Sequence, residues 1–155
     1  MHNLAKTPIK IGMQTIRNRI VSSPVSINMA KEDGQVSDNI VSFFSNLAKN
    51  NLGMVTIGAI SASDEGRDTK KGMGIGKKEH FDGLKKLSDS IKQHGAAACA
   101  QLFHVGAQGN SHLSGIRMVG PSKGYIDPNI GIEAEELTID EIKKIEDDFV
   151  RGIIQ

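Results

Sequence analysis

Residues 96–106 read AAACAQLFHVG, an uncharged apolar run that ends in a glutamine, a histidine and a glycine. A run that is apolar on both faces is typical of a strand inside a parallel sheet that helices cover on both sides. Polar side chains at the carboxyl end of such a strand lie where α/β folds place their chemistry. Gln101 and His104 are therefore candidate functional residues.

Two earlier segments have the same form, and helical patterns separate the three. Residues 19–27 predict a strand that stops pairing near Pro24, because proline has no N–H to donate to a ladder. Residues 54–60 predict a second strand that ends in the bare backbone of Gly58 and Ala59. Amphipathic helices are expected from Ser37 to about residue 49 and over about residues 80–94. A third is expected to begin at a capping box, Thr138 to Glu141.

This alternation predicts a parallel sheet with right-handed crossovers, so the fold class is α/β. Residues 10–16 predict a short hairpin with Gly12 at its turn. Three strands alone would leave an apolar sheet edge open, and a closed barrel of this kind typically takes about 250 residues. We therefore expect a partial TIM (β/α)8 barrel, with an N-terminal hairpin and the first three β/α units. Residues 1–155 would be the N-terminal portion of a single domain that is incomplete at its C-terminus.

Composition excludes several classes of protein. The chain has 155 residues, 38% hydrophobic and 24% charged, which suits one folded domain. A net charge of +1 and a single tyrosine argue against a nucleic-acid surface. Cys99 is the one cysteine, so an internal disulfide is excluded, and we expect a small buried core residue. No apolar stretch approaches the roughly 20 residues of a membrane helix, and a cytoplasmic location is the default expectation.

The glycine-rich segment of residues 64–78 does not fit a phosphate-binding loop. Gly72, Gly74 and Gly76 suggest one, but Lys71 stands where that motif needs a glycine, and Lys78 where it needs serine or threonine. We expect this segment to be a flexible connection.

The three strand ends together form a candidate binding site. In a barrel, Pro24-Val25-Ser26, Gly58-Ala59 and the pair of Gln101 and His104 would line one mouth. They include no carboxylate, which leaves a paired-acid mechanism without support, and the histidines have no recognised metal-ligand spacing. A hydroxyl, an amide, an imidazole and bare backbone suit a neutral, planar, hydrogen-bonding ligand such as a flavin ring.

The chain resembles the old yellow enzyme family of FMN-dependent NAD(P)H oxidoreductases from about residue 8 to residue 149. The resemblance rests on short motifs that are weak singly and specific in their order and spacing: RNRIVSSP at 17–24, DGQVS at 33–37, EGR at 65–67, QLFHVG at 101–106, GPS at 120–122 and ELT at 136–138. One departure is Ala107, which stands where the family usually has arginine, so any contact of that guanidinium is lost.

The resemblance implies FMN as cofactor and assigns roles by position. Pro24, Val25 and Ser26 would lie along the flavin, with the Ser26 hydroxyl at its edge. Ala59 would lie beside the ring, and Gln101 would pair with the pyrimidine edge through its donor and acceptor. Asn28 and His104 are candidate substrate contacts. Structural alternatives stay open: Ser26 could cap a strand end, Gln101 could satisfy loop backbone, and His104 could be structural.

The implied activity is reduction of activated alkenes by NAD(P)H through the flavin. The family's catalytic residues would lie beyond residue 155, so no catalytic residue is assigned, and the 155-residue chain is expected to be inactive alone. The alternative is a non-catalytic remnant or assembly module that completes its sheet with another chain, for example as a homo-oligomer through the exposed sheet edge. A third hypothesis is that the chain comes from another TIM-barrel enzyme of similar layout.

Overall fold

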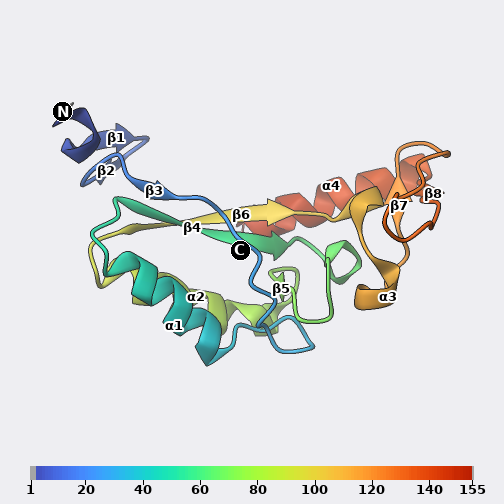
Figure 1. The fold of residues 1–155 in the computed structure, drawn as a ribbon, viewed down its shortest axis with the longest axis horizontal. Coiled ribbons are helices and arrows are strands. Elements are labelled where there is room, and N and C mark those ends of the chain that lie inside the picture. The colour runs from blue at the N-terminus through green and yellow to red at the C-terminus, as the bar shows by residue number, and fades with distance from the viewer. Residues whose placement is uncertain (1–2, 155) are drawn as a thin grey trace.

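The computed structural model describes residues 3–154 and shows a hairpin, a parallel sheet and flanking helices (Figure 1). A 3-10 turn, η1 (Asn3–Lys6), precedes the antiparallel pair β1 (Ile9–Ile11) and β2 (Gln14–Ile16). Gly12 joins the two strands with φ of +56°, a left-handed conformation that glycine adopts without steric cost. The expected hairpin is confirmed.

The sheet is built around β4 (Met54–Ser61), and all of its strands are parallel. β6 (Ala97–Phe103) pairs with β4 along nearly its whole length. The other edge of β4 is shared by two short strands, β3 (Val21–Ser22) at its start and β5 (Met73–Gly74) at its end. The α/β class with a parallel sheet is therefore confirmed.

β3 is much shorter than the predicted strand of residues 19–27. Before it, the Asn18 carboxamide oxygen accepts a hydrogen bond from the Ile20 N–H, which is thereby withdrawn from the sheet. After it, Pro24 has no N–H to offer, and the chain leaves the sheet. The strand is correspondingly reduced to two paired residues.

Two helices connect the strands and bury the core against the sheet. α1 (Asp38–Ala48) begins where Ser37 Oγ accepts a hydrogen bond from the Ile40 N–H, as the predicted cap requires. α2 (Phe81–Lys92) follows the short η3 (Lys78–His80) and ends before Gly95, which has φ of +75°. Figure 1 shows both helices on the same side of β4 and β6. The core between them comprises mainly Ile40, Phe44, Ala48, Val55, Ile57, Ile60, Leu87 and Ile91.

The expectation that β6 is covered on both faces is wrong for the described residues. Ala100 and Gln101 are exposed, and Cys99 is half-buried rather than fully buried. Within residues 3–154, β6 pairs with β4 on one edge only. The apolar run is thus a strand with one open edge and one partly open face.

The glycine-rich segment is more ordered than a flexible connection. It contains η2 (Asp64–Gly66), β5 and η3. A Cβ atom on Gly72 would lie 2.7 Å from Asp68 Oδ1, one on Gly74 2.8 Å from His80 Cε1, and one on Gly76 2.6 Å from the Ala62 carbonyl oxygen. The three glycines therefore serve close packing of the loop on itself and on its neighbours.

Residues 106–137 form an excursion at one end of the molecule (Figure 1). It contains η4 (Gly106–Gln108), α3 (Ser111–Ser114) and the parallel pair β7 (Val119–Gly120) and β8 (Glu135–Glu136). The sequence predicted only irregular structure at residues 110–128, and α3 and β7 were missed.

α4 (Ile139–Ile154) begins at the predicted capping box, and part of its apolar surface is exposed. The Thr138 N–H donates to Glu141 Oε2 at 2.8 Å, and the Glu141 N–H donates to Thr138 Oγ1 at 3.3 Å. Asp148 and Gly152 are buried, whereas Ile153 is 75% exposed. Gly152 allows the helix to pack closely on Ile75 and Leu102, because a Cβ atom there would lie 3.1 Å from Ile75 Cγ2 and 3.4 Å from Leu102 Cδ1. No helix among the described residues combines the length and apolarity needed to cross a bilayer.

Arg17 and Asn18 fix the amino-terminal side of the sheet. The Arg17 guanidinium donates to the Leu52 carbonyl from Nε and Nη2, at 2.9 and 2.7 Å, and to the His94 carbonyl from Nη1 at 2.8 Å. Asn18 Nδ2 donates to the Asn51 carbonyl at 2.8 Å. These bonds hold the loops that lead into β4 and β6. They thereby fix the position of the two strands relative to each other.

Candidate functional site

Pro24, which follows β3, and Gln101, within β6, both contact Gly58 in the carboxyl-terminal half of β4. Gly58 and Ala59 do not end this strand, as the sequence predicted, because β4 continues to Ser61. A Cβ atom on Gly58 would lie 2.5 Å from Pro24 Cβ and 3.0 Å from Gln101 Oε1, so these three residues are in close contact. In the β4–β6 ladder, Ile57 pairs with Ala100 and Ile60 with Leu102. Gly58 and Ala59 together therefore oppose Gln101 alone, an irregularity of the kind that redirects a side chain next to a site.

The side chains at this edge leave an open surface of mixed chemistry. Pro24, Val25, Ser26 and Gln101 are exposed, and Ala59 is half-buried. In the described part of the chain the Gln101 amide takes no hydrogen bond, so its donor and its acceptor both remain available. An amide, a hydroxyl and small apolar groups fit the edge of a planar heteroaromatic ring. The residues present are compatible with a flavin at this edge.

Ser26 is held by polar groups of the segment that follows β4. Its Oγ lies 3.0 Å from Asp68 Oδ2 and 3.3 Å from Asn28 Oδ1. Asn28, at φ of +45°, also accepts a hydrogen bond from Thr69 Oγ1 at 3.0 Å. Asp68 and Thr69 were not among the predicted site residues. The available signal was their position immediately after the EGR motif.

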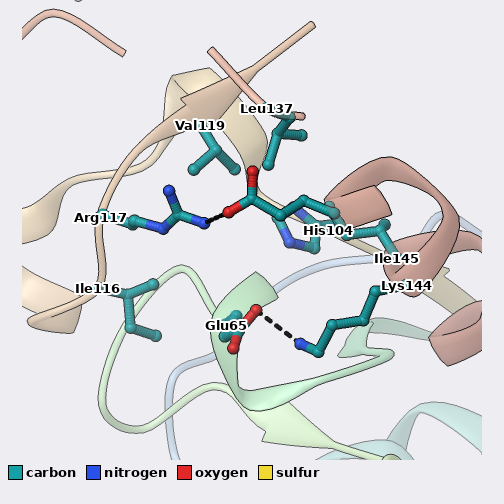
Figure 2. Close-up of a pocket in the computed structure, with 9 residues that line it drawn as sticks. Glu65, His104, Ile116, Arg117, Val119, Leu137, Lys144 and Ile145 are labelled. Carbon is teal, nitrogen blue, oxygen red and sulfur yellow. Dashed lines mark hydrogen bonds and ion pairs between the residues drawn. The ribbon is translucent and has the colours of Figure 1, made fainter. Parts of the chain in front are cut away.

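His104 lines a different feature, a cavity of about 140 Å³ between η2, the excursion and α4 (Figure 2). Its Nδ1 accepts a hydrogen bond from the Gly106 N–H at 3.1 Å, and its ring packs on Gly66. Burial lowers the pKa of His104, against the opposing effect of Glu65 and then Asp148. The neutral imidazole therefore carries its proton on Nε2. Glu65, Ile116, Arg117, Val119, Leu137, Glu141, Lys144 and Ile145 form the remaining walls.

The structure thus brings Pro24, Ala59 and Gln101 to one edge, with Ser26 and Asn28 beyond Pro24 on the same segment. It aims the His104 ring into the separate cavity.

Ion pairs across that cavity tie the excursion and η2 to α4. Arg117 pairs with Glu135 at 3.0 Å and also with Glu141, while Lys144 pairs with Glu65 at 2.9 Å. The Thr138 N–H and, second, the Arg117 guanidinium lower the pKa of Glu141 from 4.5 to about 2. Because these groups are largely exposed, each pair contributes little by itself, and the network acts mainly by fixing geometry.

Replacing Glu141 with glutamine should change how stability depends on pH. The folded-state pKa of Glu141 is depressed, so its stabilising effect is present above pH 4.5 and is lost as the pH falls toward 2. Glu141→Gln should therefore destabilise the chain at about pH 7 and have little effect at about pH 2, measured by urea unfolding. Glu146→Gln, on an exposed position of the same helix, is the control. Equal effects of both variants at both pH values would show that the network is not formed.

Comparison with known proteins gives a single family. The profile of the NADH:flavin oxidoreductase / NADH oxidase family matches residues 6–153. An NADH oxidase of Thermoanaerobacter brockii is 28% identical over 148 residues, which are 94% of this chain and 23% of that protein. An NADPH dehydrogenase of Bacillus cytotoxicus is 35% identical over 107 residues, 68% of this chain and 31% of that protein. The chain spans about a quarter to a third of the length of these curated relatives.

Solved structures show the same arrangement of the chain. A 2-naphthoyl-CoA reductase in complex with 2-naphthoyl-CoA matches with a TM-score of 0.91 and 26% identity, over 98% of this chain and 25% of that one. An old yellow enzyme homologue from Zymomonas mobilis matches with a TM-score of 0.84 and 23% identity, over 96% of this chain and 43% of that one. The second likeness, at that identity, concerns the fold alone.

Proposed function

Because the chain belongs to the NADH:flavin oxidoreductase / NADH oxidase family, we propose that β3, β4 and β6 are the first three strands of an FMN-binding (β/α)8 barrel. FMN is the cofactor that the family and its old yellow enzyme neighbours indicate. α1 and α2 connect successive parallel strands, as the crossovers of such a barrel do. Residues 1–155 would then form the N-terminal portion of one barrel domain.

The contact of Pro24, Gly58 and Gln101 carries the proposal of a flavin site. In it, the Gln101 amide pairs with the pyrimidine edge, since its donor and acceptor can bond a ring edge that offers both. Pro24 and Val25 present exposed apolar surface to the ring, and half-buried Ala59 allows close approach. The Ser26 hydroxyl lies at the periphery of this edge, next to Asn28.

The whole protein is proposed to be an NAD(P)H-dependent oxidoreductase that reduces activated alkenes. Bound FMN would supply hydride transfer, and the residues of this chain would bind and orient its ring. Asn28 lies beside Ser26 and is retained as a proposed substrate contact. His104 is a weaker candidate because its ring packs on Gly66 and lines the separate cavity.

Titration of the chain with FMN tests this site. Gln101→Ala should raise the FMN dissociation constant by about tenfold, because two hydrogen bonds to the ring are lost. Flavin fluorescence and absorbance report the binding. Gln14→Ala, an exposed glutamine on β2, is the matched control and should leave the constant unchanged. Equal affinities of the wild type and Gln101→Ala would contradict the proposed role.

The 155-residue chain alone is expected to show no appreciable turnover. Its candidate flavin edge is open to water, whereas a closed active site expels water and thereby strengthens the interactions that orient the reactants. NADPH oxidation with and without cyclohexenone, at saturating FMN, measures this directly. A rate typical of flavoenzymes, about 1 per second or more, would contradict the expectation.

The second candidate is an assembly module that completes its sheet with another chain. It is favoured by the open edge of β6 within the described residues and by exposed Val150, Ile153 and Ile154 on α4. Two measurements separate the candidates: light scattering gives the oligomeric state, and the absorbance spectrum shows whether FMN is bound. A yellow species after incubation with FMN supports the flavin site, and a colourless dimer supports the assembly module.

A further inference from the structure

The carboxylate of Asp68 is placed on Ser26 by long-range packing. Asp68 lies 42 positions after Ser26 in the chain, and its Oδ2 is 3.0 Å from Ser26 Oγ. Its other oxygen, Oδ1, is buried and has no hydrogen-bond partner among the described residues. A carboxylate with one satisfied and one unsatisfied oxygen is costly to bury, so its position calls for a specific explanation.

Gly72 supplies the room in which this carboxylate lies. A Cβ atom at residue 72 would be 2.7 Å from Asp68 Oδ1, closer than such atoms approach. The absence of a side chain at Gly72 thus allows Asp68 to reach Ser26. This contact explains why residue 72 has no side chain.

The contact fixes where the Ser26 proton points. An ionised carboxylate can only accept, so the serine hydroxyl must donate its single proton to form the bond. The second acceptor, Asn28 Oδ1, is farther away at 3.3 Å and already accepts from Thr69. Since a charged acceptor makes the stronger hydrogen bond, the Ser26 hydroxyl donates its hydrogen bond to Asp68 rather than to Asn28. Ser26 then presents only lone pairs to any other neighbour.

We propose that Asp68 is a positioning residue that turns the Ser26 hydroxyl into an acceptor toward the flavin, which makes reduction of the bound cofactor less favourable. The inference rests on the proposed flavin site at the strand ends. Reduction adds electron density to the ring, and a hydroxyl that donated to the ring would stabilise that density. A hydroxyl whose proton is held by Asp68 cannot do so.

The test compares the affinities of the chain for oxidised and reduced FMN, because their ratio reports the shift in reduction potential. Asp68→Ala should favour reduced over oxidised FMN by about tenfold, since it frees the Ser26 proton. In a Ser26→Ala background the same change should have much less effect. Asp68→Asn keeps an acceptor oxygen without the charge, so it should shift the ratio in the same direction as Asp68→Ala but by less.

The double-mutant comparison separates positioning from charge. If Asp68→Ala shifts the ratio equally with and without the Ser26 hydroxyl, or not at all, the proposal is overturned. Failure of the wild type to bind FMN in either form would instead count against the proposed function.

In the FMN-free chain, the NMR resonance of the Asp68 carboxyl carbon checks the contact alone. It should move in Ser26→Ala and in Gly72→Ala. An unmoved resonance in both variants would overturn the proposal independently of FMN.

Discussion

Gly58→Val should weaken FMN binding by the chain by about 10- to 100-fold. A Cβ atom at this position already lies 2.5 Å from Pro24 Cβ and 3.0 Å from Gln101 Oε1, and valine adds two methyl groups. The strand ends would have to separate, which displaces the Gln101 amide from its place beside β4. FMN titration by fluorescence measures the loss, and circular dichroism verifies that the variant is folded.

Gly120→Ala is the matched control for this prediction. Gly120 is also buried in a strand, but a Cβ atom there would lie 3.5 Å from the Ser122 carbonyl oxygen, its nearest neighbour, which is an ordinary contact distance. The control should therefore bind FMN as the wild type does. An unchanged affinity in a folded Gly58→Val variant would mean that the flavin does not bind at this edge.

Phe44→Ala should reduce the free energy of unfolding by about 3–5 kcal/mol. Phe44 is fully buried on α1 within the core that α1 and α2 form against the sheet. Its ring also meets the ring of Phe43 edge-to-face, with centroids 5.1 Å apart. Truncation removes these contacts and leaves a cavity that the surrounding helices and strands fill only in part. Urea unfolding measures the change.

Phe43→Ala is the comparison variant. Because Phe43 is only half-buried, its truncation should reduce the free energy of unfolding by less than that of Phe44. If Phe44→Ala is too unstable to fold, Phe44→Leu retains most of the volume and should be destabilised by about 1–2 kcal/mol. A loss for Phe44→Ala no larger than that for Phe43→Ala would show that α1 does not pack on the sheet as described.

The helices α1, α2 and α4 and the long strands β4 and β6 could be predicted because local chemistry determines them. Ser37 caps α1, and Thr138 and Glu141 form the box that starts α4, each through contacts within a few residues. The short strands β5, β7 and β8 were missed because they depend on distant partners. β5, for example, is a strand only because it lies beside the end of β4. The close packing of α4 depends on the fit of Gly152 against Ile75 and Leu102, which helical periodicity does not indicate.

The residues of the candidate site also divide into those that the sequence could predict and those that depend on distant contacts. Pro24, Ala59 and Gln101 could be predicted to lie together because parallel strands bring the ends of their segments to one side of a sheet, and Pro24 and Gln101 do both contact Gly58, the neighbour of Ala59. Asp68 was missed because its contact with Ser26 spans the α1–β4 unit. The direction of His104 depends on the turn at Gly106, whose N–H bonds to the imidazole, and no pattern in the sequence indicated it.

The most direct measurement is NMR mapping of FMN on the isotope-labelled chain. The largest shift changes are expected at the Gln101 side-chain amide and at the backbone of Gly58, Ala59 and Ser26, which would place the ring at the ends of β3, β4 and β6. Changes confined to the cavity around His104 and Arg117, or spread evenly over the surface, would contradict the account.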